Sequence, residues 1–309
     1  MPENPLLKRL AGVFRGKREA HEFYREGLLG TSFEFKAWGC SVQLAETAEE
    51  AAVAEIDRLE QIFSIYQPDS ELNRFFGSTD WLEVSPELAE VLDLAESWRV
   101  KTEGAFNPAA QSILEHLKES EDAKSVSSEP NWEVDLGQMK ARLLTSHRCS
   151  LNAIAKGWIV DRAASIAAEY GLSDILINIG GDLRFWGDVP HLAAVTDPTN
   201  DAENAPPISV VELRNEGLAT SGGYRRGIER DGQRISHLMD PLKGTEARGV
   251  LSATVVAPSA MIADVVATAL TVFEPEKGLE FAASHNCRCL VIDSSRRIFK
   301  CSGWDHRTI

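Results

Sequence analysis

Two oxygen-bearing side chains stand one helical turn apart near the end of the chain. Residues 260–273 predict a helix, in which successive residues are rotated by about 100°. Asp264 and Thr268 then lie together, nearly opposite an apolar side formed by Ile262, Val266, Ala269, Leu270 and Phe273. Carboxylate and hydroxyl oxygens so placed suit Mg²⁺, which prefers oxygen ligands. The alternative is an exposed polar face on which the threonine bonds back to its own helix.

Two adjacent glycines follow a short apolar stretch in the middle of the chain. Residues 173–179 predict a strand that leads directly into Gly180, Gly181 and Asp182. Adjacent glycines accept positive φ and carry no side chain, so the backbone here is suited to close approach by a ligand. A plain turn is the other interpretation, and this stretch alone does not decide between them.

A stretch rich in hydroxyls and glycine lies further on. Thr220, Ser221 and Gly222 stand close to Arg225 and Arg226. Backbone N–H groups and guanidinium groups in this combination are suited to phosphate oxygens. Ser-Gly-Gly is also common in ordinary turns, so the signal is weak by itself.

His237 follows in a separate segment that ends in a Pro-containing turn. Its imidazole titrates near neutrality and is therefore able to accept a proton from a hydroxyl nucleophile. A structural histidine is the alternative interpretation.

The chain is predicted to contain both strands and helices, and these elements would position the groups described so far. Period-2 alternation or short apolar runs predict strands at residues 30–38, 193–196, 208–213 and 251–257. Apolar residues at helical spacing predict helices at residues 47–63 and 86–102, and a further helix that begins at Leu151. Thr47 is the expected cap of the first helix, and Pro86 follows Ser85 at the start of the second. The predicted class is one mixed α+β body.

Composition restricts the possible partners. The chain has 309 residues, of which 43% are hydrophobic and 26% charged, which is ordinary for a soluble globular protein. Its formal net charge is -15, so a nucleic-acid partner is disfavoured. An anionic ligand would need a local basic group or a metal ion to hold it.

The cysteines and the lack of targeting signals favour a cytoplasmic protein. An odd number of cysteines without a regular framework indicates reduced thiols, at Cys40, Cys149, Cys287, Cys289 and Cys301. The spacing of the last three is not that of a zinc site. No apolar run approaches the roughly 18 residues of a membrane span, and the N-terminus has no signal-peptide core.

The N-terminus has its own character. Residues 5–18 predict a basic amphipathic helix with an apolar side. Such a helix is either a membrane-surface or partner-docking arm, or a helix folded against the acidic body. We expect a basic segment at residues 1–26 and a single domain at residues 27–309.

Eight stretches carry a resemblance that spans about residues 28–281. In chain order they are GTSFEF, SIYQPDSELNRF, SPELAEVLDLAESWRVKTEGAFNP, LNAIAKGWIVD, LINIGGDLRFWG, ATSGGYRR, SHLMDPLKG and ATVVAPSAMIADVVATAL. Together they resemble the ApbE family, the flavin transferases that move FMN from FAD onto a protein threonine. The resemblance implies one α+β domain of T-fold-like architecture, with mixed or antiparallel sheets and packed helices, that binds FAD and one Mg²⁺ in a cleft.

The resemblance also implies roles for individual residues. The metal would be held by Asp264, Thr268 and the backbone carbonyl of Ala155, and His237 would be the base. The flavin nucleotide would be lined by Lys156, Gly180, Gly181 and Asp182. Packing on the flavin and adenine would come from Tyr66, Ala105, Phe106 and Asn107. The loop on the phosphate side would be formed by Thr220, Ser221 and Gly222.

Some positions depart from the family pattern. Asn107 and Ala109 stand where the family commonly has Asp and Thr, and Gly223 replaces an Asp. Further departures are Ser150, where an acid is usual, and Asn152 and Ala153, where glycines are frequent. The export or lipoprotein signal that is usual in the family is not seen. The expected partner is an acceptor protein with an exposed threonine, and the alternatives are a FAD pyrophosphatase or an inactive FAD-binding protein.

Overall fold

The computed structural model describes residues 19–119, 125–126, 128–200, 205–223, 227–230 and 233–304. Two predictions fall outside these residues. They concern the basic helix at residues 5–18 and the guanidinium groups of Arg225 and Arg226.

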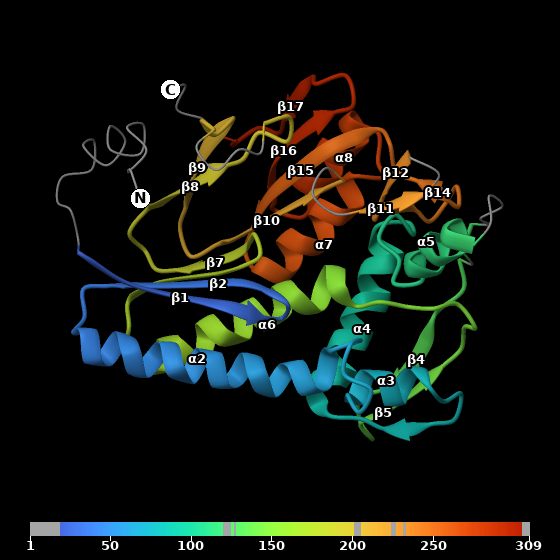
Figure 1. Cartoon of the computed structure of the whole chain (residues 1–309), viewed down its shortest axis with the longest axis horizontal. Coiled ribbons are helices and arrows are strands. Elements are labelled where there is room, and N and C mark those ends of the chain that lie inside the picture. Colours follow the sequence, from blue (N-terminus) through green and yellow to red (C-terminus); the bar gives the residue numbers. More distant parts are fainter. Residues whose placement is uncertain are drawn as a thin grey trace.

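An antiparallel sheet of eight strands forms the centre of the molecule (Figure 1). In spatial order its strands are β1 (Ala20–Leu28), β2 (Thr31–Trp38), β6 (Asp174–Ile179), β7 (Asp182–Trp186), β10 (Gly217–Gly222), β15 (Val250–Ala257), β16 (Arg288–Asp293) and β17 (Ile298–Lys300). The predicted alternation in β2 is confirmed, because Phe33, Phe35 and Ala37 are buried while the residues between them are more exposed.

Four helices pack on this sheet and on each other. They are α2 (Val42–Phe63), α6 (Asn152–Glu169), α7 (Ala260–Leu270) and α8 (Pro275–Ser284). Helix α6 contacts α2 and α7, and α7 also contacts β10 and β15. Because α7 has neighbours on several sides, most of its residues are buried, including Asp264.

Helix α2 begins earlier than the sequence predicts. Ser41 is the N-cap, and its side chain accepts a hydrogen bond from Leu44 N at 3.3 Å. The expected cap, Thr47, lies inside the helix and donates its hydroxyl to Gln43 O at 2.9 Å. The prediction that Thr47 caps the helix is therefore wrong. The apolar residues at helical spacing that predict this helix form its inner stripe, and all of them are buried: Ala52, Val53, Ile56, Leu59, Ile62 and Phe63.

A smaller module packs beside the main sheet. Its sheet has the order β3 (Leu82–Glu83), β5 (Lys140–Leu143) and β4 (Trp132–Asp135). Helices α3 (Glu71–Phe76) and α4 (Pro86–Lys101) contact it, whereas α5 (Ala110–Glu119) packs Ile113 and Leu114 against Met239. Trp132 is buried and donates its indole N–H to Leu92 O at 2.8 Å, which ties this sheet to α4.

Three two-stranded sheets complete the described fold. They pair β8 (His191–Val195) with β9 (Ser209–Leu213), β11 (Gly227–Arg230) with β12 (Gln233–Ser236), and β13 (Met239–Asp240) with β14 (Thr245–Glu246). The predicted α+β class with antiparallel sheets and packed helices is confirmed.

The N-terminal boundary differs from the expected one. Strand β1 pairs with β2 from Ala20 opposite Trp38 to Leu28 opposite Thr31. Residues 20–26 therefore belong to the central sheet rather than to a separate segment. Within the described residues, no helix combines the length and the apolar character that crossing a membrane requires.

Candidate active site

The first turn of α7 lies unusually close to two other elements. A Cβ atom on Gly157 of α6 would stand 2.6 Å from Ala260 O, and one on Gly217 of β10 would collide with Ala260 N. Only glycine fits at such approaches. The two glycines thus allow α6, α7 and β10 to meet closely enough for their side chains to share one site.

Two buried carboxyl groups and one ammonium group meet at this junction. Asp264 of α7 is 6% exposed and Asp182 of β7 is 2% exposed. Lys156 of α6 places Nζ 2.7 Å from Asp182 Oδ2. Burial raises the pKa of Asp264 well above its ordinary value, and the neighbouring Asp182 raises it further, while Lys156 opposes the shift.

The acidic pair has unsatisfied oxygen atoms. Among the described residues, Asp264 Oδ2 is buried and has no hydrogen-bond partner. Asp182 Oδ2 has the Lys156 ammonium at ion-pair distance, but not in the geometry of a hydrogen bond. A buried carboxylate oxygen without a partner is costly, and a cation would satisfy it. The donor set is made of hard oxygens, so these residues fit Mg²⁺.

The fit to a metal depends on neutral oxygens as well. In the part of the chain that the structure describes, no group of three or more His, Cys, Asp or Glu side chains is placed to hold a metal. The carbonyl of Ala155, one residue before Lys156, and the hydroxyl of Thr268 are the neutral donors that the sequence predicts. Ala155 is a buried residue of α6, and its role as a ligand stays a prediction.

Thr268, which is predicted to hold the metal together with Asp264, lies next to the stretch predicted to bind phosphate. Its Oγ1 lies 3.2 Å from Ser221 Oγ on β10. The exposed polar face that was the alternative for this helix is wrong, because Asp264 is buried and Thr268 points toward a neighbouring strand. The structure therefore brings two stretches that are distant in sequence together.

Residues 220–222 form the end of a strand rather than a loop, which corrects the prediction. Thr220 lies opposite Thr254 of β15, and their hydroxyl oxygens are 2.9 Å apart. Strand pairing continues to Gly222, since the neighbouring strand β15 extends beside it.

Gly223 brings β10 close to the segment that carries His237. A Cβ atom at Gly223 would lie 2.6 Å from Ser236 Oγ and 3.1 Å from Ser236 Cβ. An aspartate at this position, as in the family pattern, would require Ser236 to move. Ser236 can approach this closely because residue 223 is a glycine.

The backbone on both sides of His237 is held while its side chain is exposed. Ser236 N donates to Glu246 Oε1 at 2.6 Å, and Ser236 Oγ accepts from Leu238 N at 3.0 Å. His237 itself is exposed. An imidazole so placed is accessible to a hydroxyl group on another protein, and its role as base stays a prediction.

The double glycine forms a two-residue β-hairpin turn. Gly180 has φ +58° and Gly181 has φ +100°, between paired residues Ile179 and Asp182. A Cβ on Gly180 would lie 2.8 Å from the Thr31 side chain, whereas nothing stands within 4 Å of one on Gly181. The turn thus accounts for both glycines. Close approach of a ligand at Gly181, which faces open space, remains a prediction.

The predicted flavin-packing loop has buried side chains. Ala105 and Phe106 are 1% and 2% exposed, so any ring contact here would come from the backbone. Asn107 is also buried, and its Oδ1 accepts hydrogen bonds from Ala109 N at 2.9 Å and from Asn131 Nδ2 at 3.2 Å. This fixed loop lies beside the start of α6 because Ser150 N donates to Pro108 O at 2.9 Å.

Tyr66 behaves differently from the rest of the predicted flavin-packing residues. It is 84% exposed, so its ring is not part of the core. Its loop is fixed by Asn73, whose Nδ2 donates to the carbonyls of Ser64, Ile65 and Gln67. Sequence reasoning missed Asn73, although its position inside the quoted motif SIYQPDSELNRF was a signal.

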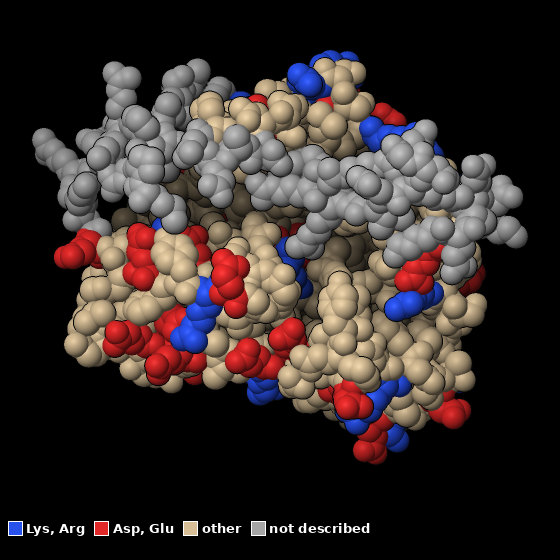
Figure 2. All heavy atoms as spheres, in the orientation of Figure 1, with Lys and Arg blue, Asp and Glu red and all other residues tan. Residues whose placement is uncertain are grey.

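The surface is hollowed near the centre of the face in Figure 2. In Figure 1, the same region is where α6 and α7 approach α4 and α5.

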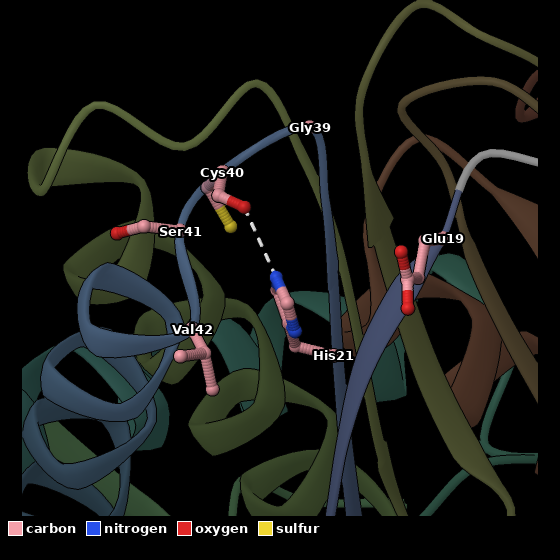
Figure 3. A pocket seen from close by; sticks show the side chains of 6 residues that line it. All are labelled: Glu19, His21, Gly39, Cys40, Ser41 and Val42. Atoms are coloured by element: carbon pink, nitrogen blue, oxygen red, sulfur yellow. Dashed lines mark hydrogen bonds between the residues drawn. The ribbon is translucent and has the colours of Figure 1, made fainter.

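A cavity of about 410 Å³ lies elsewhere, between the start of β1 and the start of α2 (Figure 3). His21 points toward Cys40 there, with Nε2 3.0 Å from its carbonyl oxygen. None of the predicted site residues lines this cavity.

Fold and site together define an α+β protein with a buried acidic pair suited to a divalent cation. The sequence model of the ApbE family matches residues 29–291, so this chain belongs to the ApbE family. The predicted family resemblance and fold are thereby confirmed.

Individual relatives agree over most of their length. The chain is 30% identical to the FAD:protein FMN transferase of Vibrio cholerae serotype O1, over 88% of this chain and 87% of that protein. It is 28% identical to the FAD:protein FMN transferase of Escherichia coli K12, over 88% and 84%. The structure is similar to that of the ApbE protein of Thermotoga maritima, with a TM-score of 0.82, 26% identity and coverage of 92% and 97%.

Proposed function

We propose that this chain is a Mg²⁺-dependent FAD:protein FMN transferase. It moves FMN from FAD to the threonine hydroxyl of an acceptor protein and releases AMP. The observation that carries the proposal is the buried Asp264 carboxyl group, with an oxygen that has no described hydrogen-bond partner, beside Asp182 and Lys156. The relatives from Vibrio cholerae and Escherichia coli support it, because both are named FAD:protein FMN transferase.

The residues around Asp264 would hold the metal and the phosphates. Asp264, Thr268 and the carbonyl of Ala155 are the proposed ligands. When bound, Mg²⁺ offsets negative charge on the diphosphate and on the leaving AMP. Lys156 adds a positive charge, and its ion pair with Asp182 fixes the ammonium in place. The end of β10, at Thr220, Ser221 and Gly222, lies next to Thr268 through the Ser221 hydroxyl.

His237 would act on the acceptor. Its imidazole accepts the proton of the threonine hydroxyl as that oxygen attacks the phosphorus of the FMN half. A P–O bond to threonine forms, the P–O bond to AMP breaks, and AMP leaves with the bonding electron pair. The exposure of His237 supports this role, because the nucleophile is carried by another protein and must arrive from solvent.

The isoalloxazine and adenine rings would be held at the rim of the site. Tyr66 offers an exposed ring for stacking. The loop containing Ala105, Phe106 and Asn107 would contribute its backbone, since its side chains are buried. Backbone at Gly180 and Gly181 would complete the nucleotide site.

The test is an incubation with FAD, Mg²⁺ and a purified flavin-acceptor domain, with a chelator-treated sample as control. We expect covalent flavin fluorescence on the acceptor in denaturing gels, only with Mg²⁺ present and lost when the acceptor threonine is replaced. Free FMN without labelled acceptor would instead identify a FAD pyrophosphatase. Unchanged FAD would identify an inactive FAD-binding protein.

A cytoplasmic location belongs to the same proposal. It is supported by the thiols, since all five cysteines are free. Fractionation of cells that express the full chain tests it, and recovery with the membrane or export fraction would contradict it.

A further inference from the structure

Asp161 of α6 binds the first turn of α7 from outside that helix. Its Oδ1 accepts a hydrogen bond from Ala260 N and its Oδ2 accepts one from Met261 N, both at 2.9 Å. The first N–H groups of a helix have no partner within the helix and carry its positive end, so a carboxylate is a strong partner for them. Both oxygens of one side chain thus fix the start of α7.

The same carboxylate connects to β7 through Arg184. Arg184 Nε lies 3.5 Å from Asp161 Oδ1, and the arginine side chain is only 8% exposed. Arg184 is held in turn, because Nη2 donates to Asn215 Oδ1 at 2.7 Å and Nη1 donates to Phe185 O at 3.1 Å. Asp182 stands two residues earlier on β7, and alternate residues of a strand share one face. Asp161 therefore joins the three elements that carry Lys156, Asp182 and Asp264.

An ordinary cap does not explain this arrangement. Helix α7 already has an N-cap, Ser259, whose side chain accepts from Ile262 N at 3.2 Å. Asp161, which lies on α6, contacts the first turn of α7. Asp264 lies one turn further along α7. The close approaches at Gly157 and Gly217 leave that turn no free space on two sides. Its rotation and its position along the axis, and hence those of Asp264, are set from outside.

We propose that Asp161 is a positioning residue for the metal site of this protein. It holds α7 so that Asp264 faces Asp182 with one oxygen open to a cation. The inference rests on the proposed function, because that function supplies the metal. Residues behind metal ligands typically change metal affinity or activity by about 10–100-fold when mutated.

The test is the affinity for Mg²⁺, measured by calorimetry on the full chain with FAD present, in the variant Asp161→Asn. The amide has the same shape but offers one acceptor oxygen instead of two, and its NH₂ group would face an N–H donor. We expect the dissociation constant for Mg²⁺ to rise by about 10–100-fold. The affinity for FAD in chelator should change less than about threefold, because Lys156, Asp182 and Tyr66 are untouched.

Ser85→Ala is the matched control. The Ser85 side chain accepts from Leu88 N at 3.2 Å and caps α4, a helix outside the α6–α7 junction. The control should lower the melting temperature while leaving Mg²⁺ affinity unchanged. If Asp161→Asn also lowered only the melting temperature and bound Mg²⁺ like the wild type, Asp161 would be a cap alone and the inference would be overturned.

Arg184→Gln is the second variant and decides the matter if Asp161→Asn does not fold. It leaves both Asp161 hydrogen bonds in place but removes the ion pair that links Asp161 to β7. The affinity for Mg²⁺ should therefore fall by a smaller factor than in Asp161→Asn. An unchanged affinity would refute the link. Wild-type protein that binds Mg²⁺ and FAD without transferring FMN would refute the proposed function and leave this inference standing. Wild-type protein that binds no divalent cation would refute both.

Discussion

Asp182 and Asp264 place their carboxyl groups side by side in the interior, one on a strand and one on a helix. Burial and the Asp182 charge raise the pKa of Asp264. Lys156 Nζ lies 2.7 Å from Asp182 Oδ2. Two acidic groups so close, with a single ammonium beside them, are unfavourable unless a proton or a cation is bound. A divalent cation bound by these carboxyl groups would offset their mutual repulsion.

Replacing Asp264 with Asn should therefore separate function from stability. Asn has the same shape without the charge, so the metal-free variant should unfold at the same or a higher denaturant concentration than the wild type. Mg²⁺-dependent turnover should fall by at least the roughly 10–100-fold that is typical of residues behind metal ligands, because Asp264 is itself a proposed ligand. Mg²⁺ should raise the melting temperature of the wild type, because it binds the folded state, and should not raise that of Asp264→Asn. An unchanged rate in the variant would refute Asp264 as a ligand.

His237→Ala should slow FMN transfer by about 10²–10⁴-fold if the imidazole is the general base. The side chain is exposed, so the variant should keep the fold and should bind FAD with wild-type affinity. The measurement is single-turnover transfer at saturating acceptor and FAD. A decrease of less than roughly fivefold would indicate a structural histidine.

Tyr66→Ala should weaken FAD binding without changing stability. The ring is 84% exposed, so its removal leaves no cavity. Aromatic pairs are worth about 0.5–1.5 kcal/mol, which corresponds to an increase of roughly 2–13-fold in the dissociation constant. Fluorescence titration with FAD measures it. Tyr170→Ala, which removes another partly exposed tyrosine at the end of α6, is the control and should leave FAD binding unaffected.

Alanine at the double glycine should distinguish the turn from a ligand contact. Gly180→Ala should destabilise the protein by about 1–2 kcal/mol for the left-handed backbone, and further through contact with Thr31. Gly181→Ala is also strained but meets no neighbour, so its unfolding free energy should fall less. Denaturant unfolding gives both values. A loss of FAD affinity in Gly181→Ala alone would support ligand contact, whereas unchanged affinity in both would leave only the turn.

His191 should make stability depend on pH. Its ring stacks on Phe185 at 5.3 Å, and burial lowers its pKa to about 4. An unfolded histidine has a pKa near 6.5 and so binds a proton that the folded state rejects. The contribution of neutral His191 to stability is therefore complete above about pH 6.5 and is lost as pH falls toward 4. The unfolding free energy should decrease by on the order of 1–3 kcal/mol over this range.

His191→Phe keeps a ring in the stack and removes the titrating group. Urea unfolding at pH 7, 5.5 and 4.5 should show a smaller loss of stability in the variant than in the wild type. Equal losses in the two proteins would mean that other groups cause the pH dependence.

The sequence predicted what depends on neighbours in the chain. The inner stripe of α2, the start of α4 after Ser85 and the alternation in β2 follow from periodicity and capping, which are local. The start of α2 was missed because Ser41 competes with Thr47, and both are good caps. The order of motifs was enough to indicate the family.

Only the tertiary structure decided how the site is assembled. That Asp182 lies against Asp264 depends on the position of β7 relative to α7, and no spacing in the chain encodes that distance. The close approaches at Gly157 and Gly217 and the two hydrogen bonds of Asp161 depend in the same way on packing between distant segments. The chain by itself therefore determined its elements and its family, whereas the packing of α6, α7 and β7 determined which charges meet, because burial and charge interactions act through space.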